Sequence, residues 1–275
     1  MKRILIVCVS YNSYKVLYEY IRSIDVAAKE ALDIAEVVVA IADNTYENFE
    51  DILPEVRHIE IKVFPYHKNW GYMGGIVAVL QDLGRDYVSS FNYVIASNVD
   101  LSLSKSFFVS LCRREFAEDV AWIAPSIYRQ DKSNENPFQL NRISKIKFNL
   151  LIVMYSFPPL YNFYQRLSKS QQKDIKREDK LEEKIIFAGM GSIFIFTRSF
   201  MEKAYPLTFP CFMYGEEVYY GELVYRNNMK TLFVPSIEVY DIGAVSTGKL
   251  SLKQKCDMNK DSLKTIKQMF NTDKI

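Results

Sequence analysis

The stretch FNYVIASNVD, residues 91–100, carries the pattern that decides the fold. A run of apolar and small residues leads directly into the polar Ser97, Asn98 and Asp100. A strand without polar alternation is buried on both faces, as strands of parallel sheets are. The polar residues then emerge at the carboxyl edge of the sheet, where ligands bind in open α/β folds. This stretch therefore predicts a parallel α/β sheet with a binding site at the end of the strand.

Strands of the same kind lie on both sides of it in the sequence. We expect strands at residues 4–10, 36–42, 59–64 and 120–126, and helices at residues 13–31, 71–83 and 105–117. Ser13 is placed to cap the first of these helices. The alternation of strands and helices predicts a doubly wound, mainly parallel sheet in the first 125 residues.

The alternation stops after residue 126, and the second half of the chain is mixed. We expect a polar loop at residues 129–142, an apolar and aromatic segment at 146–167, and a solvated segment of mixed charge at 168–184. Strands return at residues 192–197, 231–234 and 237–239, with a helix running from about residue 217 to 227. The predicted division is therefore residues 1–125, an insertion at 126–184, a second part of the same domain at 185–248, and a basic C-terminal helix or tail at 249–275.

The segment at 146–167 has two interpretations. It combines aromatic residues with a central Pro-Pro pair and with Lys145, Lys147, Arg166 and Lys169 at its ends. Its uninterrupted apolar run is too short to span a bilayer. It is either a buried helical hairpin or subunit interface of a homodimer, which we favour, or an element that contacts the membrane surface.

Composition excludes several other classes of function. The 275 residues include 35 basic and 33 acidic side chains, a net charge of +2 that gives no reason to expect a nucleic-acid partner. The cysteines are too far apart in sequence for a clustered metal site, and Cys8 lies inside an apolar strand. The N-terminal apolar run is short and lacks a cleavage site, so we expect a reduced, cytoplasmic setting.

Four polar constellations can carry chemistry, and each also has a purely structural explanation. Asp100 can hold a metal ion and a diphosphate, or cap a turn. Asp43 can accept from a base or a ribose, or form an Asx turn. The glycines of NWGYMGG, residues 69–75, can bring backbone N–H groups to a phosphate, although the spacing is that of neither a dinucleotide fingerprint nor a Walker loop. Glu216 or Glu217 can accept a proton, or cap a helix.

Taken in order, these motifs resemble the inverting glycosyltransferases of family 2, and most closely a bacterial rhamnosyltransferase-like branch. The resemblance covers roughly residues 1–125 and 185–260. It is carried by SYN at 10–12, ADN at 42–44, NWGYMGG at 69–75, SNVD at 97–100 and FMYGEE at 212–217. It implies a GT-A fold, with a nucleotide-binding parallel sheet, a mixed acceptor-binding part and a helical insertion.

The resemblance also implies roles for individual residues. Glu217 would be the catalytic base, with Glu216 as the second choice. The segment at 189–191 would line the acceptor cleft. Asp100 would bind a divalent cation, Mg²⁺ or Mn²⁺, together with the donor diphosphate. The residues that would bind the nucleotide sugar are Ser10, Tyr11, Asp43, Asn69, Gly71, Asn98 and Asp100.

Four features depart from the family pattern. Asn98 replaces the first acid of the DxD motif, and the ED motif is Glu216-Glu217, so the base would be a longer carboxylate than Asp. Ile76 replaces the common Asn after the glycines, and Asp241 replaces a late His. Asp241 is either a hard oxygen ligand that joins Asp100 on the metal, or a sign that a ligand has been lost.

The implied reaction moves a sugar from a nucleoside diphosphate, dTDP or UDP, to a glycan or polyprenyl-diphosphate-linked glycan acceptor in cell-surface polysaccharide synthesis. A lipid-linked acceptor would bring the protein to the inner face of the cell membrane as a peripheral protein. Two alternatives stay open. One is a non-catalytic binding protein on the same fold. The other is a sugar-nucleotidyltransferase, although SYNSYK after the first strand lacks the glycine-rich loop that such enzymes carry.

Overall fold

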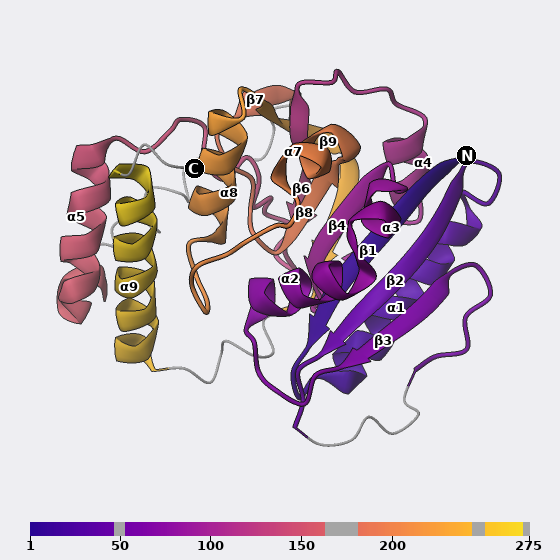
Figure 1. Ribbon diagram of the computed structural model, residues 1–275, viewed down its shortest axis with the longest axis horizontal. Helices are drawn as coiled ribbons and strands as arrows, with labels where there is room; N and C mark the ends of the chain where they lie inside the picture. Colours follow the sequence, from indigo (N-terminus) through magenta and orange to yellow (C-terminus); the bar gives the residue numbers. More distant parts are fainter. Residues whose placement is uncertain (47–52, 163–180, 244–250, 272–275) are drawn as a thin grey trace.

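The computed structural model describes residues 1–46, 53–162, 181–243 and 251–271. In these ranges the strands form one sheet, parallel in its N-terminal half and mixed beyond it (Figure 1). The predicted α/β fold with a mainly parallel sheet is confirmed. The strands are β1 (Lys2–Ser10), β2 (Ala35–Asp43), β3 (Glu60–Pro65), β4 (Tyr93–Asn98), β5 (Leu101–Leu103), β6 (Val120–Tyr128), β7 (Lys184–Ile186), β8 (Ile193–Thr197) and β9 (Lys230–Asp241).

Helices cover both faces of this sheet and form two apolar cores with it. The helices α1 (Tyr14–Lys29) and α4 (Phe107–Cys112) pack on one face. The opposite face holds most of the remaining helices. Those are α2 (Tyr72–Leu83), α3 (Arg85–Ser89), α5 (Lys145–Ser156), α7 (Arg198–Ala204), α8 (Glu216–Arg226) and α9 (Leu252–Asn271).

The order of the strands explains why so many strand ends meet at one edge. The main path runs β3-β2-β1-β4-β8-β6-β9-β5, with β7 pairing β9. β4 is parallel to β1 and antiparallel to β8, so the end of β4 lies beside the start of β8. β6 is antiparallel to β8, and β9 is parallel to β6. Both strands therefore run in the same direction as β4 and end at the same edge. The carboxyl ends of β1, β2, β4, β6 and β9 therefore lie at one edge of the sheet.

The apolar strands fold as the sequence predicts. Cys8 is buried in β1, and the four cysteines are free. β2 is buried along almost its whole length, since β1 and β3 flank it in the sheet and helices cover it.

Three local predictions are wrong. The predicted helix at 105–117 is only α4, because the chain leaves the helix after Cys112 and Phe116 packs edge-on against Tyr93. The predicted strands at 231–234 and 237–239 are one strand, β9, in which a bulge after Val234 accommodates Pro235. Ser13 makes no capping hydrogen bond, since its hydroxyl accepts from the N–H of Tyr11 instead.

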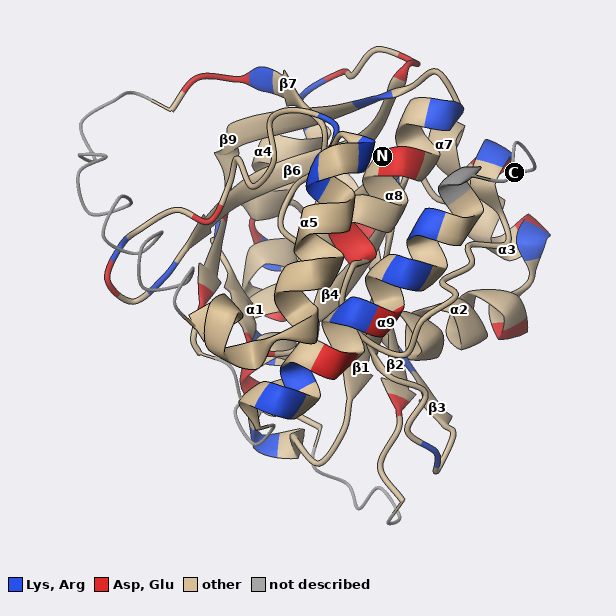
Figure 2. Cartoon of the chain, turned by 90° about the vertical axis from the view of Figure 1, so that its left-hand side faces the viewer, with Lys and Arg blue, Asp and Glu red and all other residues tan. Residues whose placement is uncertain are grey.

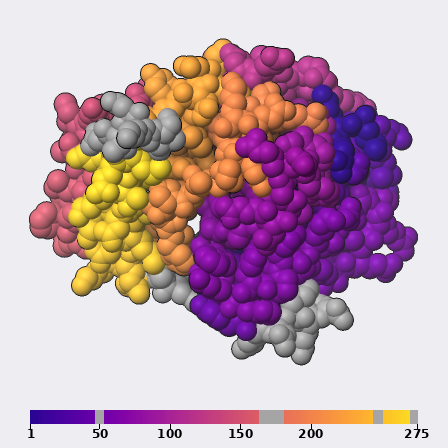
Figure 3. Space-filling view, in the orientation of Figure 1, coloured from indigo at the N-terminus to yellow at the C-terminus, as the bar shows by residue number. Residues whose placement is uncertain are grey.

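The predicted polar segment at 129–142 is a loop with isolated bridges to neighbouring strands. Beyond it, α5 packs along α9 at one end of the molecule (Figures 1 and 3). Residues 163–180 lie outside the described residues. They include Arg166, Lys169 and most of the predicted segment at 168–184. In the described part of the chain, no helix combines the length and apolar character needed to cross a membrane.

Candidate active site

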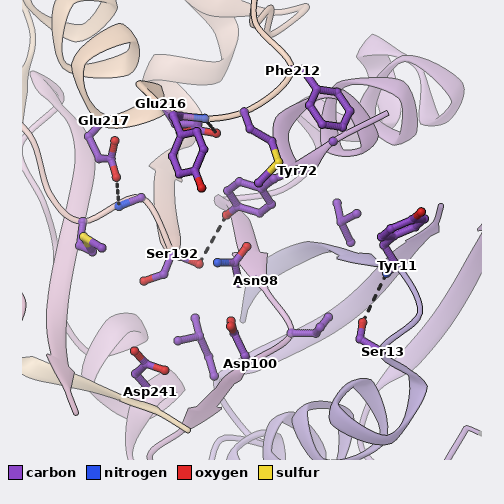
Figure 4. A pocket seen from close by; sticks show the side chains of 18 of the residues that line it. Tyr11, Ser13, Tyr72, Asn98, Asp100, Ser192, Phe212, Glu216, Glu217 and Asp241 are labelled. Carbon is purple, nitrogen blue, oxygen red and sulfur yellow. Dashed lines mark hydrogen bonds between the residues drawn. The ribbon is translucent and has the colours of Figure 1, made fainter. Parts of the chain in front are cut away.

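A cavity of about 530 Å³ lies where the strand ends meet (Figure 4). Its lining comes from both halves of the sheet, from the loop before α2, from the start of α8 and from α9. In Figure 4, Asp100 and Asp241 lie on one side of this cavity, and Glu216 and Glu217 lie on the other. Acids that are more than 100 residues apart in sequence therefore face the same space.

The end of β4 is held against the start of β8 by main-chain hydrogen bonds. The N–H of Asn98 donates to the carbonyl of Ser192 over 2.9 Å. The hydroxyl of Tyr72, from the first turn of α2, donates to the same carbonyl over 3.4 Å. Asn98 and Asp100 line the cavity just beyond this junction. The strand end that the sequence singled out is thus a rigid part of the cavity wall.

Asp100 and Asp241 are brought together by the pairing of β5 with β9. Leu101, next to Asp100, pairs with Asp241, and the N–H of Ile242 donates to the carbonyl of Asp100 over 3.1 Å. One carboxylate oxygen of Asp241 also accepts from the N–H of Gly243 over 2.8 Å. The described residues contain no cluster of three or more His, Cys, Asp or Glu that could hold a metal. Mg²⁺ nevertheless takes only one or two carboxylates from a protein when substrate phosphates supply further ligands.

The loop before α2 approaches the start of the α8 segment very closely. Gly71 has φ of +73°, and a Cβ there would lie 2.2 Å from the carbonyl oxygen of Phe212. Only glycine fits such a contact. The side chain of Asn69 accepts from the N–H of Gly71 over 3.0 Å, and that of Asn44 donates to its carbonyl over 3.1 Å. The glycine-rich loop is therefore a fixed wall of the cavity.

Glu216 and Glu217 open α8 beside this wall. Oε1 of Glu216 accepts from the N–H of Tyr214 over 3.0 Å. Oε1 of Glu217 accepts from the N–H of Gly191 over 3.2 Å. A Cβ on Gly191 would lie 2.7 Å from that oxygen, so the missing side chain makes room for the carboxylate. The two acids are anchored by different main-chain donors.

Burial changes the acidity of both glutamates. Burial, and then the neighbouring charge of Glu217, raises the pKa of Glu216 above its ordinary value. Burial also raises the pKa of Glu217, although its hydrogen bonds to main-chain N–H groups act in the opposite direction. A carboxylate with a raised pKa is a stronger base than an exposed one, which suits a group that removes a proton.

Most of the sequence-predicted site residues line the cavity, but two do not. Tyr11, Asn69, Gly71, Asn98, Asp100, Asp241, Glu216 and Glu217 are all among its lining residues. Ser10 is fully buried beside Ser13. Asp43 is fully buried as well, and its two oxygens accept from the hydroxyl of Tyr14 and the N–H of Thr45. Direct contact of Ser10 or Asp43 with a nucleotide thus stays a prediction.

The predicted acceptor segment at 189–191 is divided between the cavity and the core. Gly191 lines the cavity, as does Met190. A Cβ on Gly189 would lie 2.7 Å from Ala124, so Gly189 faces the core instead.

Several lining residues were missed by sequence reasoning. Arg129 and Glu135 form an ion pair at the cavity, inside the segment predicted only as a polar loop. Their position just after the strand predicted at 120–126 is the signal that could have found them. Arg129 is the one cation among the described lining residues. Tyr72 was quoted within its motif without a role, and Met258 comes from α9, whose position no local pattern reveals.

Comparison with solved structures shows which known fold this architecture resembles. The chain is similar to the crystal structure of GalNAc-T7 with UDP, GalNAc and Mn²⁺, with a TM-score of 0.53 and 12% sequence identity. The similarity covers 90% of this chain and 45% of that one. The fold is that of GT-A glycosyltransferases. The fold expected from the sequence motifs is thereby confirmed, while identity this low shows the fold alone. No protein-family model and no curated protein matches the sequence.

Proposed function

We propose that the protein is an inverting glycosyltransferase that uses a nucleoside-diphosphate sugar. The observation that carries this proposal is the placement of Asp100 and Glu217 on opposite sides of one cavity, on a GT-A fold (Figure 4). An acid on the donor side and a half-buried carboxylate across from it are what a single displacement requires.

The donor would occupy the side of the cavity formed by the first half of the sheet. Tyr11, Asn69 and Gly71 line that side, with Asn98 and Asp100 at the end of β4. Arg129 supplies a positive charge near a diphosphate, although its Nε and one terminal nitrogen are paired with Glu135. GalNAc-T7 holds UDP in its crystal structure, which supports a UDP-sugar, and dTDP is the other nucleotide that the motifs imply.

A divalent cation fits this donor side. Asp100 and Asp241 would hold Mg²⁺ or Mn²⁺, because both offer the hard carboxylate oxygen that these ions prefer. The bound ion would offset negative charge on the departing diphosphate. The Mn²⁺ in the structure of GalNAc-T7 supports this proposal.

Glu217 would remove a proton from the acceptor. As the acceptor oxygen bonds to the anomeric carbon, the bond from that carbon to the diphosphate oxygen breaks. The nucleoside diphosphate leaves with the bonding electrons, the proton of the hydroxyl passes to Glu217, and the configuration at carbon inverts. The N–H of Gly191 fixes the carboxylate for this step. Glu216 is the alternative base.

The acceptor would be a glycan or a polyprenyl-diphosphate-linked glycan in cell-surface polysaccharide synthesis, bound near Met190 and Gly191. The free cysteines suit the cytoplasmic location that we propose. The rhamnosyltransferase-like branch is likewise part of the proposal, and it rests on the sequence motifs.

Thermal-shift measurements with UDP, dTDP and GDP, with and without Mn²⁺, test the donor site. A nucleotide that binds the folded state raises the melting temperature, and at a hundredfold excess over Kd it adds about 2.7 kcal/mol of stability. We expect one nucleotide to stabilise the protein more when Mn²⁺ is present, and we expect Asp100→Ala to abolish that extra shift. Asp86→Ala, on the exposed surface of α3, is the matched control. If no nucleotide shifts the melting temperature, the proposal is wrong.

Metal-dependent hydrolysis of the matching nucleotide sugar then separates an enzyme from a binding protein. An active transferase without acceptor slowly transfers the sugar to water. Nucleotide binding without any hydrolysis or transfer to a glycan acceptor would favour the non-catalytic alternative.

A further inference from the structure

The outer face of α5 carries an uncovered apolar stripe. Ile146, Leu150 and Val153 are 75%, 63% and 51% exposed. Their spacing of four and then three places them on one face of the helix. Phe157, at the end of α5, and Leu160, beyond it, are also exposed, at 60% and 48%. We call these five residues the α5 stripe. Contiguous exposed apolar surface of this kind marks an interaction site.

The opposite face of α5 is fixed to the protein. Phe148 is 3% exposed and belongs to the apolar core, against which Leu151, Ile152 and Tyr155 also pack. α9 packs along α5 and itself reaches the core through Ile266. The α5 stripe is therefore presented by a helix that is already held in place, so the buried interpretation of this segment holds for its inner face alone.

The two helices together are strongly basic. α5 and α9 contain seven lysines and two aspartates, a net charge of +5 on a chain whose total is +2. The rest of the chain is thus net negative, at −3. Figure 2 shows this end of the molecule, with the lysines of α9 beside α5. The lysines are Lys145, Lys147, Lys253, Lys255, Lys260, Lys264 and Lys267.

This charge decides between two occupants of the stripe. A second copy of the chain in a twofold dimer would bring the same basic helices against each other, and like charges at an interface are unfavourable. An anionic bilayer attracts the lysines and accepts the apolar side chains among its acyl chains. α5 is roughly 18 Å long at 1.5 Å per residue, which suits a helix lying on a bilayer surface.

We propose that the α5 stripe and the lysines of α5 and α9 form a surface that docks peripherally on an anionic lipid bilayer. The surface adjoins the cavity, since Met258 of α9 lines it. Met258 lines this cavity together with Glu216 and Glu217. Docking would therefore bring the Glu217 side of the cavity close to the bilayer, where an acceptor with a lipid anchor would be found.

Co-sedimentation of the full chain with vesicles tests the proposal. The vesicles are phosphatidylcholine, with or without phosphatidylglycerol, at low and high ionic strength. We expect binding to the anionic vesicles that weakens as salt rises, because exposed charges are screened. Leu150→Gln with Val153→Gln should abolish most of the binding. The matched control is Val26→Gln with Leu32→Gln, two apolar side chains exposed to 44% and 51% elsewhere on the surface.

A second pair of variants tests the charge. Lys253→Gln with Lys264→Gln should weaken partition into anionic vesicles about tenfold or more, from the loss of two basic residues near the surface. Lys105→Gln with Lys203→Gln removes equal charge from exposed positions outside these helices and should change little. Circular dichroism confirms that each variant is folded.

Two results would overturn the proposal. One is a wild-type chain that stays in the supernatant with anionic vesicles at low ionic strength. The other is a dimer, seen by light scattering, that the α5 variants dissociate, since the stripe would then bind a second copy. The outcome is independent of the proposed chemistry, because Asp100→Ala should dock as the wild type does even if that variant has lost donor binding.

Discussion

The carboxylate of Glu217 sits where a side chain on Gly191 would be. Its Oε1 accepts the hydrogen bond of the Gly191 N–H at 3.2 Å, and a Cβ at Gly191 would come within 2.7 Å of it. The start of β8 and the start of α8 are thereby fitted to one another, and the position of the candidate base depends on a residue 26 positions earlier.

Gly191→Ala should therefore displace Glu217 and reduce transfer while leaving donor binding unchanged. The added methyl group leaves no room for the carboxylate in its present position. Steady-state kinetics with the identified donor, alongside thermal shift with the nucleotide, measure the two effects separately. Gly74→Ala, on α2, is the control, since its Cβ would meet only the Cβ of Trp70, at 3.3 Å. Unchanged transfer in Gly191→Ala would contradict the role assigned to this contact.

Glu217→Gln should keep nucleotide binding and lose transfer. The substitution removes the proton acceptor at nearly constant volume, and loss of a general base typically costs ~10²–10⁴-fold in rate. Glu216→Gln should be much milder if Glu217 is the base. An inactive Glu216→Gln variant beside an active Glu217→Gln variant would reverse the assignment.

Stability should depend on pH through Glu216. Because burial raises its pKa in the folded state, the folded protein keeps a proton that the unfolded chain releases. The stabilising contribution is complete below the pKa of the unfolded chain and is lost as the pH rises through the higher pKa of the folded protein. Glu216→Gln stays neutral, so its melting temperature should fall less than that of the wild type over this range.

Melting curves recorded across the acidic to mildly alkaline range measure this difference. Glu202→Gln, an exposed glutamate on α7, should follow the wild type. Parallel curves for Glu216→Gln and the wild type would show that the carboxylate is not held in a protonated form by burial.

Gly71→Ala should destabilise the protein by more than about 2 kcal/mol, since a left-handed backbone alone costs an alanine 1–2 kcal/mol. The collision with the carbonyl of Phe212 adds to this cost. Gly84→Ala is a matched control, because Gly84 has φ of +80° and nothing within 4 Å of its Cβ position. Urea unfolding measures the loss of unfolding free energy in each variant, and the difference between the two losses is the cost of the collision. Equal losses would show that the segment around Phe212 moves aside without resistance.

Much of this site could be predicted from the sequence because its residues follow apolar strands directly. Asn98 ends β4 and Asp100 follows it closely, and a parallel strand brings the residues at its end to the carboxyl edge whatever its neighbours are. Asp43 shows the limit of that reasoning. It ends β2 in the same way, yet Tyr14 and Thr45 occupy its oxygens and remove it from the cavity lining.

The rest of the site depends on pairings between distant segments. Arg129 reaches the cavity because β6 runs parallel to β9, and the α5 stripe is uncovered because α9 takes only the inner side of α5. The sequence shows that Arg129 follows a strand and that α5 has an apolar face, but it does not show which strand pairs with β6 or which face of α5 another helix covers.

The bulge in β9 also sets which residues of this strand reach the site. Pro125 pairs with Val234, but the next residue of β6, Ser126, pairs with Glu238, so three residues of β9 are taken up between them. That count is what delivers Asp241, and not Tyr240, to the place opposite Leu101. A strand shifted by one residue turns every side chain to the other face. Deleting one bulge residue would thus put a neighbouring side chain in place of the Asp241 carboxylate, although no residue that lines the cavity had been substituted. A change in the length of this bulge can therefore alter the chemistry of the site as effectively as a substitution does.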